Sequence, residues 1–381
     1  MGSRAATERA ARPETGVPMR SVCAAAPQLA GVVPYDPKYL PATAVLSANE
    51  NPHDVDDEIR RDIMREVKRL PLNRYPDPLA NDLRDMIAEA NGLDRDQVLV
   101  GNGGDELLFN LALAWGGPGR AFLNLPPTFS VYDANARLTN TSVVDVPRRA
   151  DFSIDEEAVL ARVAEGGIDY LVVTSPNNPT GQLASETFIL RLLDATDALV
   201  MVDEAYFEFS RQTMRPYLAQ HKNLVILRTF SKAFSLAGAR MGYILGDAEV
   251  VREFVKVRQP YSVDAVSQAV ARVVYANRAK FERGILAVIE ERARLIEGLK
   301  RIPGVKPFPS DANYVLFRVE NAPVIWEALY ERGVLVRDFS RAAHLENCLR
   351  VTVGASEEND AFLRALRDAV MGKCDLKVPS T

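Results

Sequence analysis

The sequence LVILRTFSKAFSLAGARMGYIL, residues 224–245, places two apolar runs on either side of a polar segment. The runs, residues 224–227 and 242–245, are short and continuous, which is typical of strands that are buried on both faces of a sheet. Between them lie two hydroxyl residues, a lysine and an arginine, namely Thr229, Ser231, Lys232 and Arg240. The segment therefore predicts a loop at the end of a buried strand whose hydroxyl, amine and guanidinium groups could bind a ligand.

Five apolar runs of the same character precede these two in the sequence. Segments with helical periodicity lie between them, at residues 106–115, 129–137 and 186–195. This alternation predicts an α/β fold, with a seven-stranded, mostly parallel sheet sandwiched between helices. The predicted strands are residues 98–100, 121–125, 142–146, 170–174, 199–202, 224–227 and 242–245.

The character of the sequence changes after about residue 250. Residues 267–300 are rich in helix formers, and strand-like pieces at 314–319, 334–337 and 348–353 precede a last helix at 357–370. We therefore predict three parts, which are a flexible N-terminal arm at residues 1–32, a large domain at 33–255 and a smaller α+β domain at 256–381.

Composition and charge exclude several classes of protein. The 381 residues are 47% apolar or aromatic and carry a net charge of −5, without a basic stripe, so nucleic acid is not an expected partner. The apolar runs fall far short of the roughly 20 residues of a membrane span. Cys23, Cys348 and Cys374 lie far apart, which indicates neither a disulfide framework nor a zinc site. We expect a soluble cytoplasmic protein with no membrane partner.

A glycine-rich turn joins a predicted strand to a helix in VLVGNGGDELL, residues 98–108. Glycine lets the backbone approach a ligand closely, and the N–H groups and dipole of a new helix favour an anion. The turn is a candidate phosphate cup, although the same pattern also occurs at ordinary helix starts. It matches neither the Gly-x-Gly-x-x-Gly pattern nor the P-loop.

The strand at residues 170–174 runs into SPNNPTG, residues 175–181. Pro179 holds Asn178 in extended geometry, with its amide able to contact a ligand. A well-formed turn without a ligand is the alternative interpretation, and for this motif taken alone it is the preferred one.

The strand at residues 199–202 ends at Asp203, and Tyr206 follows shortly after. A carboxylate at the carboxyl end of a buried strand occupies a usual ligand-binding position, and burying it unpaired is costly. We therefore expect a cation beside Asp203, either a metal ion or a protonated heterocyclic nitrogen. The three histidines, His53, His221 and His344, provide no ligand cluster near it in sequence, and we predict no metal.

Lys232 follows the strand at residues 224–227, so it should emerge at the same sheet edge as Asn178 and Asp203. A lysine there can form a Schiff base with a carbonyl, whereas a lone lysine is ordinarily a solvated surface charge. Thr229, Ser231 and Arg240 are phosphate-binding groups. Pyridoxal 5'-phosphate, with its aldehyde, ring nitrogen, phenolic oxygen and phosphate, matches the whole set.

Each polar group then has an expected role. Asp203 would keep the ring nitrogen protonated, while Asn178 and Tyr206 would hydrogen-bond the ring oxygen. Phe129, in PPTFSVY at residues 126–132, is placed to stack on the ring face, with packing between loop and sheet as the alternative.

At this point the chain resembles the aspartate aminotransferase superfamily of fold type I, and within it the histidinol-phosphate aminotransferases. The motifs occur in the family's order and cover roughly residues 33–370. They are LSANENP (46–52), LNRYPDP (72–78), GNGGDELL (101–108), PPTFSVY (126–132), SPNNPTG (175–181), VDEAY (202–206), TFSKAFSLAGARMGY (229–243) and LRVTVG (349–354).

The resemblance implies a homodimer with active sites at the subunit interface, in which Tyr75 would reach the cofactor phosphate of the other subunit. It also implies that Gly104 and Asp105 offer backbone N–H groups to that phosphate. Arg350 is similar to the family's arginine for the substrate carboxylate or phosphate, and Arg337 and Tyr35 resemble further substrate contacts. For both arginines, an interdomain or surface ion pair is the alternative.

The reaction implied is a ping-pong transamination of L-histidinol phosphate with 2-oxoglutarate as acceptor, with Lys232, Asp203 and Tyr206 as the catalytic residues. An aromatic amino-acid aminotransferase and a threonine-phosphate decarboxylase share the same cofactor and are the alternatives. A non-catalytic effector module would need a DNA-binding segment that the N-terminal residues do not contain. This chain departs from the family pattern at His53, Asp54 and Val55. It also departs at Phe129, a position where the family often has tyrosine.

Overall fold

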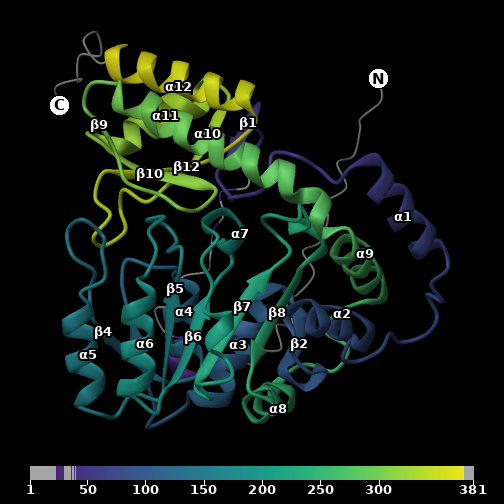
Figure 1. Cartoon of the computed structure of the whole chain (residues 1–381). Helices are drawn as coiled ribbons and strands as arrows, with labels where there is room; N and C mark the ends of the chain where they lie inside the picture. The colour runs from purple at the N-terminus through teal and green to yellow at the C-terminus, as the bar shows by residue number, and fades with distance from the viewer. Residues whose placement is uncertain (1–22, 30–35, 37, 39, 373–381) are drawn as a thin grey trace, which may run out of the picture.

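Two β-sheets organise the described part of the chain, and the larger confirms the predicted α/β class (Figure 1). The computed structural model describes residues 23–29, 36, 38 and 40–372. The larger sheet has the strand order β2-β8-β7-β6-β5-β3-β4, and only β8 runs antiparallel to its neighbours. Its strands are β2 (Val98–Asn102), β3 (Ala121–Asn124), β4 (Ser142–Asp145), β5 (Tyr170–Thr174), β6 (Leu199–Asp203), β7 (Leu224–Thr229) and β8 (Met241–Gly246).

Helices cover both faces of this sheet because alternate residues of its strands are apolar on each face. One face packs against α3 (Gly103–Trp115), α4 (Val131–Leu138) and α8 (Ala248–Val257). The other packs against α2 (Asn81–Asn91), α5 (Glu156–Ala164), α6 (Glu186–Ala195) and α9 (Ala265–Ala276). Leu171 and Val173 of β5 face the second group, whereas Tyr170 and Val172 face the first. Six of the strands are therefore largely buried on both faces, as their continuous apolarity predicts. β4 is the exception, because it lies at the edge of the sheet and none of its residues is buried.

The smaller sheet has the order β1-β11-β12-β10-β9 and lies above the large one in Figure 1. Its strands are β1 (Ala44–Leu46), β9 (Val305–Pro307), β10 (Tyr314–Val319), β11 (Val334–Asp338) and β12 (Cys348–Thr352). Three helices pack on it, α10 (Glu282–Lys300), α11 (Ala322–Glu331) and α12 (Ser356–Met371). β10, β11, β12 and α12 correspond to the strands and last helix predicted for the smaller α+β part, whereas β1 and β9 were not predicted.

Two segments connect the sheets in ways that sequence patterns did not indicate. β1 pairs in parallel with β11, with Ala44 opposite Val334, so a strand from before the large sheet completes the small one. The helix-rich residues 267–300 are divided into α9, a 3-10 turn at Arg278–Phe281 and α10. α9 lies after the predicted domain boundary at residue 255, yet it packs with the large sheet. The boundary itself stays a prediction.

Local signals explain several element ends. Asp155, Ser185 and Asp264 accept backbone N–H bonds at the starts of α5, α6 and α9.

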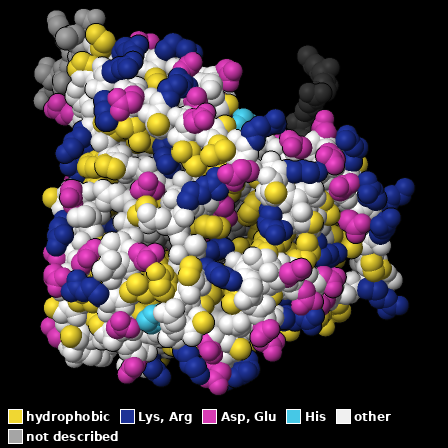
Figure 2. All heavy atoms as spheres, viewed as in Figure 1, with side chains coloured by type: hydrophobic (Ala, Val, Ile, Leu, Met, Phe, Trp, Pro, Cys, Tyr) yellow, Lys and Arg dark blue, Asp and Glu magenta, His cyan; other side chains and the backbone are white. Residues whose placement is uncertain are grey.

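The remaining α-helices of the described residues are α1 (Asp57–Lys68), which packs beside α9, and the single turn α7 (Phe207–Ser210). Figure 2 shows acidic and basic side chains interspersed over the face in view. Within the described residues, no helix is both long and apolar enough to span a bilayer.

Candidate active site

A cavity of about 1090 Å³ opens at the carboxyl ends of β5, β6 and β7 and extends beneath the smaller sheet. Parallel strands present their carboxyl ends at one edge, so the residues that follow them meet there. Twelve predicted site residues line this cavity: Gly104, Asp105, Phe129, Asn178, Asp203, Tyr206, Thr229, Ser231, Lys232, Arg240, Arg337 and Arg350.

Lys232 lies in the loop after β7, and its Nζ donates a hydrogen bond to the carbonyl oxygen of Ala48 at 3.0 Å. The same Nζ lies 6.0 Å from the centre of the Tyr206 ring. Burial, together with the positive charges of Arg350 and Arg240, lowers the pKa of Lys232 to about 8, against the opposing effect of nearby carboxylates. The uncharged form of the amine is thus far more accessible near neutral pH than in an ordinary lysine, which suits a nucleophile or a general base.

Asp203 ends β6 and is only 5% exposed. Its Oδ2 accepts a hydrogen bond from the Tyr132 hydroxyl at 2.7 Å, and its Oδ1 accepts one from the Ala205 backbone N–H at 3.0 Å. Both partners are uncharged, and burial raises the pKa of Asp203 to about 6 although these two hydrogen bonds oppose the rise. A buried acid in such surroundings favours a cationic ligand beside it.

The residues that could bind an anion gather around the N-terminus of α3. The hydroxyl oxygens of Thr229 and Ser231 lie 2.9 Å apart, and Arg240 Nη2 lies 3.0 Å from Asp105 Oδ2. The first N–H groups of α3, at Gly104 and Asp105, have no partner within the helix. Gly103 has a φ of +77°, a conformation that favours glycine, and a Cβ built on it would lie 2.7 Å from Arg240 Nη2 and displace the guanidinium.

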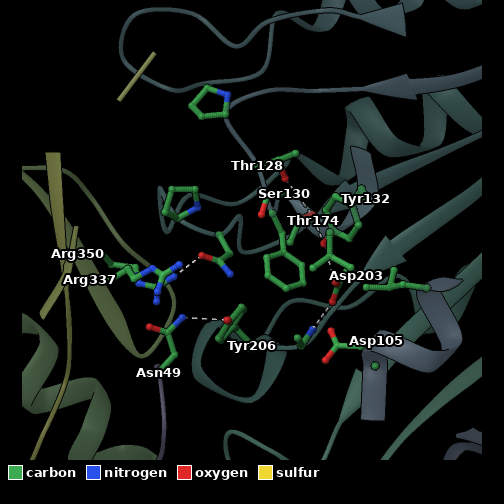
Figure 3. Close-up of a pocket in the computed structure, with 18 of the residues that line it drawn as sticks. Asn49, Asp105, Thr128, Ser130, Tyr132, Thr174, Asp203, Tyr206, Arg337 and Arg350 are labelled. Carbon is green, nitrogen blue, oxygen red and sulfur yellow. Dashed lines mark hydrogen bonds between the residues drawn. The ribbon is translucent and has the colours of Figure 1, made fainter. Parts of the chain in front are cut away.

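Two arginines of the smaller sheet face the opposite end of the cavity (Figure 3). Arg337 and Arg350 lie opposite each other on β11 and β12. Arg350 is buried, donates to the side-chain oxygen of Asn178, and donates to the carbonyl oxygen of Ser47 at 2.8 Å. Arg337 donates to the carbonyl oxygen of Asp36 at 2.9 Å. Two adjacent guanidinium groups at one wall favour an anionic substrate group there.

The site predictions for Phe129, Tyr75 and Tyr35 have three different outcomes. Phe129 lines the cavity and packs edge-on against Tyr132, with ring centres 5.6 Å apart. Tyr75 is 81% exposed, does not line the cavity of its own chain, and stacks on Tyr261 at 4.5 Å. Tyr35 lies outside the described residues.

Sequence reasoning missed several residues of the site, among them Tyr132 and Asn49. Tyr132 follows Phe129 by three positions, about one turn of the helix predicted at residues 129–137, so that periodicity could have placed its ring on the same side as Phe129. Asn49, in LSANENP, donates from its side-chain amide to the Tyr206 hydroxyl at 3.0 Å. No local pattern indicates this contact, since the two residues are 157 positions apart.

The fold and this site define a known class of enzyme. The family model "Aminotransferase class I and II" matches residues 43–366, and the chain belongs to that family. The histidinol-phosphate aminotransferase of Caldanaerobacter subterraneus subsp. tengcongensis is 36% identical to it over 341 residues, covering 90% of this chain and 97% of that relative. The family resemblance predicted from the motifs is therefore confirmed.

Solved structures show the same architecture. The histidinol-phosphate aminotransferase of Sinorhizobium meliloti, crystallised with pyridoxal-5'-phosphate, superposes with a TM-score of 0.85 at 23% identity and covers 93% of this chain and 100% of its own. The L-threonine-O-3-phosphate decarboxylase of Porphyromonas gingivalis superposes with a TM-score of 0.75 at 27% identity, covering 85% of this chain and 98% of its own.

Proposed function

We propose that the cavity binds pyridoxal 5'-phosphate and that the chain catalyses transamination of L-histidinol phosphate with 2-oxoglutarate. The observation that carries this proposal is that Lys232 and Asp203, an amine with a lowered pKa and a buried acid with uncharged partners, open onto one cavity. The donors around the α3 N-terminus supply the third element, a site for phosphate. The residues present therefore fit the cofactor.

The residues would hold the cofactor at four places. Thr229, Ser231, Arg240 and the backbone N–H groups of Gly104 and Asp105 would bind its phosphate. Asp203 would pair with its ring nitrogen, and Phe129 would stack on the ring. Asn178 and Tyr206 would donate hydrogen bonds to the ring oxygen. When bound, the cofactor supplies an electron sink for the pair of electrons that a substrate carbon retains on losing a proton.

Lys232 would act twice in the cycle. Its Nζ, uncharged in part near neutral pH, would first carry the cofactor covalently and yield that position to the substrate amine. The released amine would then act as general base and take a proton from the substrate carbon. It would next act as general acid and deliver that proton to the cofactor carbon. The contact with the Ala48 carbonyl keeps the amine at the cavity wall between the two sheets.

The choice of donor rests on the relatives and on the arginine pair. Histidinol phosphate carries a phosphate where an amino acid carries a carboxylate, and Arg337 and Arg350 lie side by side to bind such an anion. A threonine-phosphate decarboxylase is the second candidate, because a solved structure with that name is 27% identical. An aromatic aminotransferase would use the same residues.

A homodimer is part of the same proposal. Tyr75 and Tyr261 are both exposed on this chain and stack on each other away from the cavity. Exposed Leu72 lies close to Tyr75 in the chain and adds to the apolar surface there. A second copy placed on this surface would allow Tyr75 to reach the phosphate site of its neighbour.

The substrate assignment is tested by a coupled assay with histidinol phosphate, phenylalanine and O-phosphothreonine, each supplied with pyridoxal phosphate. Rapid formation of glutamate from 2-oxoglutarate with histidinol phosphate is the expected outcome. Rapid turnover of either other compound, without turnover of histidinol phosphate, would overturn the substrate assignment and leave the cofactor proposal standing.

Replacing Arg350 with alanine should raise the apparent KM for both the donor and 2-oxoglutarate by about 10- to 100-fold, because a charge-assisted bond contributes roughly 1.5–3 kcal/mol. The effect on kcat should be smaller, since the same interaction is present in ground and transition states. Initial rates over a range of both substrates measure it. Arg332→Ala, at an exposed position that bonds only within its own helix, is the control. Unchanged KM values in Arg350→Ala would show that the guanidinium does not bind substrate.

A further inference from the structure

Asn49 makes three hydrogen bonds to β12 and to the loop before β10. Its backbone N–H donates to Thr352 Oγ1 at 2.9 Å, and its backbone oxygen accepts from Asn313 Nδ2 at 3.0 Å. Its side-chain Oδ1 accepts from Thr352 Oγ1 at 3.4 Å. Asn49 is 2% exposed and has a φ of +55°, a left-handed conformation that asparagine tolerates better than most residues. Its position is therefore set by β12 and the loop before β10.

Two contacts describe the orientation of the Asn49 amide. In the structure the Thr352 hydroxyl donates to Oδ1 at 3.4 Å. The NH₂ end points to Tyr206, and Nδ2 lies 3.0 Å from the phenolic oxygen (Figure 3). The ring of Tyr206 is held in turn by an edge-on contact with Tyr314, with ring centres 5.0 Å apart.

This arrangement makes Tyr206 the acceptor in its contact with Asn49. The phenolic oxygen accepts a hydrogen bond from Asn49, so its own proton is not used in that contact. Tyr206 lines the cavity, and its hydroxyl can donate there. A reversed amide would instead present Oδ1 to Tyr206 and draw the proton away from the cavity.

We propose that Asn49 is a positioning residue, locked by Thr352, that makes Tyr206 a hydrogen-bond donor toward the ligand in the cavity. The inference rests on the proposed function, in which Tyr206 donates to the ring oxygen of pyridoxal phosphate. It links the smaller sheet to the chemistry, because Thr352 does not line the cavity and its Oγ1 makes hydrogen bonds to Asn49.

The test follows the visible absorption band of the bound cofactor as a function of pH, which reports on the ring oxygen and needs no turnover. A weaker bond from Tyr206 leaves that oxygen more basic, so the pH midpoint of the band should rise. We expect Asn49→Gly, which suits a positive φ, to raise it by about 1 pH unit, the size of one weakened bond to a charged oxygen. Tyr206→Phe should raise it at least as much.

A double-mutant cycle decides whether Asn49 acts through Tyr206. In the Tyr206→Phe background, Asn49→Gly should add no further shift. Additive shifts in the double variant, or an unchanged midpoint in Asn49→Gly alone, would overturn the positioning role. A parent protein that gives no visible band with pyridoxal phosphate would instead overturn the proposed function, and this inference with it.

Thr352 allows a second pair of variants, each of which changes only one group of the side chain. Thr352→Val keeps the shape of the side chain but removes the hydroxyl, so the amide of Asn49 is free to reverse and the midpoint should rise. Thr352→Ser keeps the hydroxyl and should restore the parent midpoint. Asn359→Ala, which removes another fully buried asparagine of the small domain that bonds Gly354 and Glu291, should lower stability without moving the band. Equal midpoints in the valine and serine variants would also overturn the proposal.

Discussion

Replacing Lys232 with alanine is expected to reduce transamination by at least about 10³-fold, because the variant loses both the covalent attachment point and the proton-transfer group. The fold should persist, since the amine of Lys232 donates a hydrogen bond to Ala48 at the cavity wall and lies outside the apolar clusters of the described residues, while its backbone contacts are kept in the variant. Single-turnover rates with histidinol phosphate measure the loss, and far-UV circular dichroism with thermal unfolding checks the fold.

Lys222→Ala is the matched control for that experiment. Lys222 is an exposed lysine of the same large domain that pairs with Glu249 at 3.4 Å, away from the cavity. It should leave the rate at the parent value. Borohydride reduction of the parent should fix the cofactor mass on the peptide that contains Lys232, and on no peptide of the alanine variant. Turnover in Lys232→Ala near that of Lys222→Ala would contradict the assigned role.

The large sheet could be predicted strand by strand because each strand carries its own local pattern. Residues of β5, β6 and β7 face apolar helices on both sides, which leaves an uninterrupted apolar run in the sequence. β1 could not be predicted in this way. It has only three residues, and Val45 between the two buried ones is 43% exposed, so the pattern is too short to distinguish from a loop. What fixes it is its pairing with β11, far along the chain.

The same distinction holds within the site. Asn178, Asp203 and Lys232 were predictable because each follows a recognisable strand, and parallel strands bring their carboxyl ends together. The partners that set their properties are tertiary. Tyr132 comes from α4 to reach Asp203, and Asn49 comes from beside β1 to reach Tyr206. Such contacts depend on how helices and the second sheet dock, which no periodicity records.

Replacing Asp203 with asparagine should lower kcat by about 10²–10³-fold, the usual cost of removing one preorganised electrostatic partner. The amide is nearly isosteric and can still accept from the Ala205 N–H, so the geometry of the loop is kept. It is neutral, however, and cannot stabilise a protonated ring nitrogen. The pKa of Asp203, raised to about 6 by burial, should fall once a cation lies beside it, so the ionised form would be the one that works with the cofactor bound.

Stability without cofactor separates this role from a structural one. Because burial raises the folded-state pKa of Asp203 above its ordinary value, the ionised side chain destabilises the cofactor-free protein at any pH above that ordinary value, and most fully above the raised one. At pH 8 the asparagine variant without cofactor should therefore unfold no more easily than the parent, even though its activity is lost. Asp169→Asn, at the opposite end of β5, where Asp169 accepts from the Ala121 N–H, is the control and should keep full activity. If Asp203→Asn turned over within a factor of about three of the parent, the charge opposite Lys232 would have no part in the chemistry.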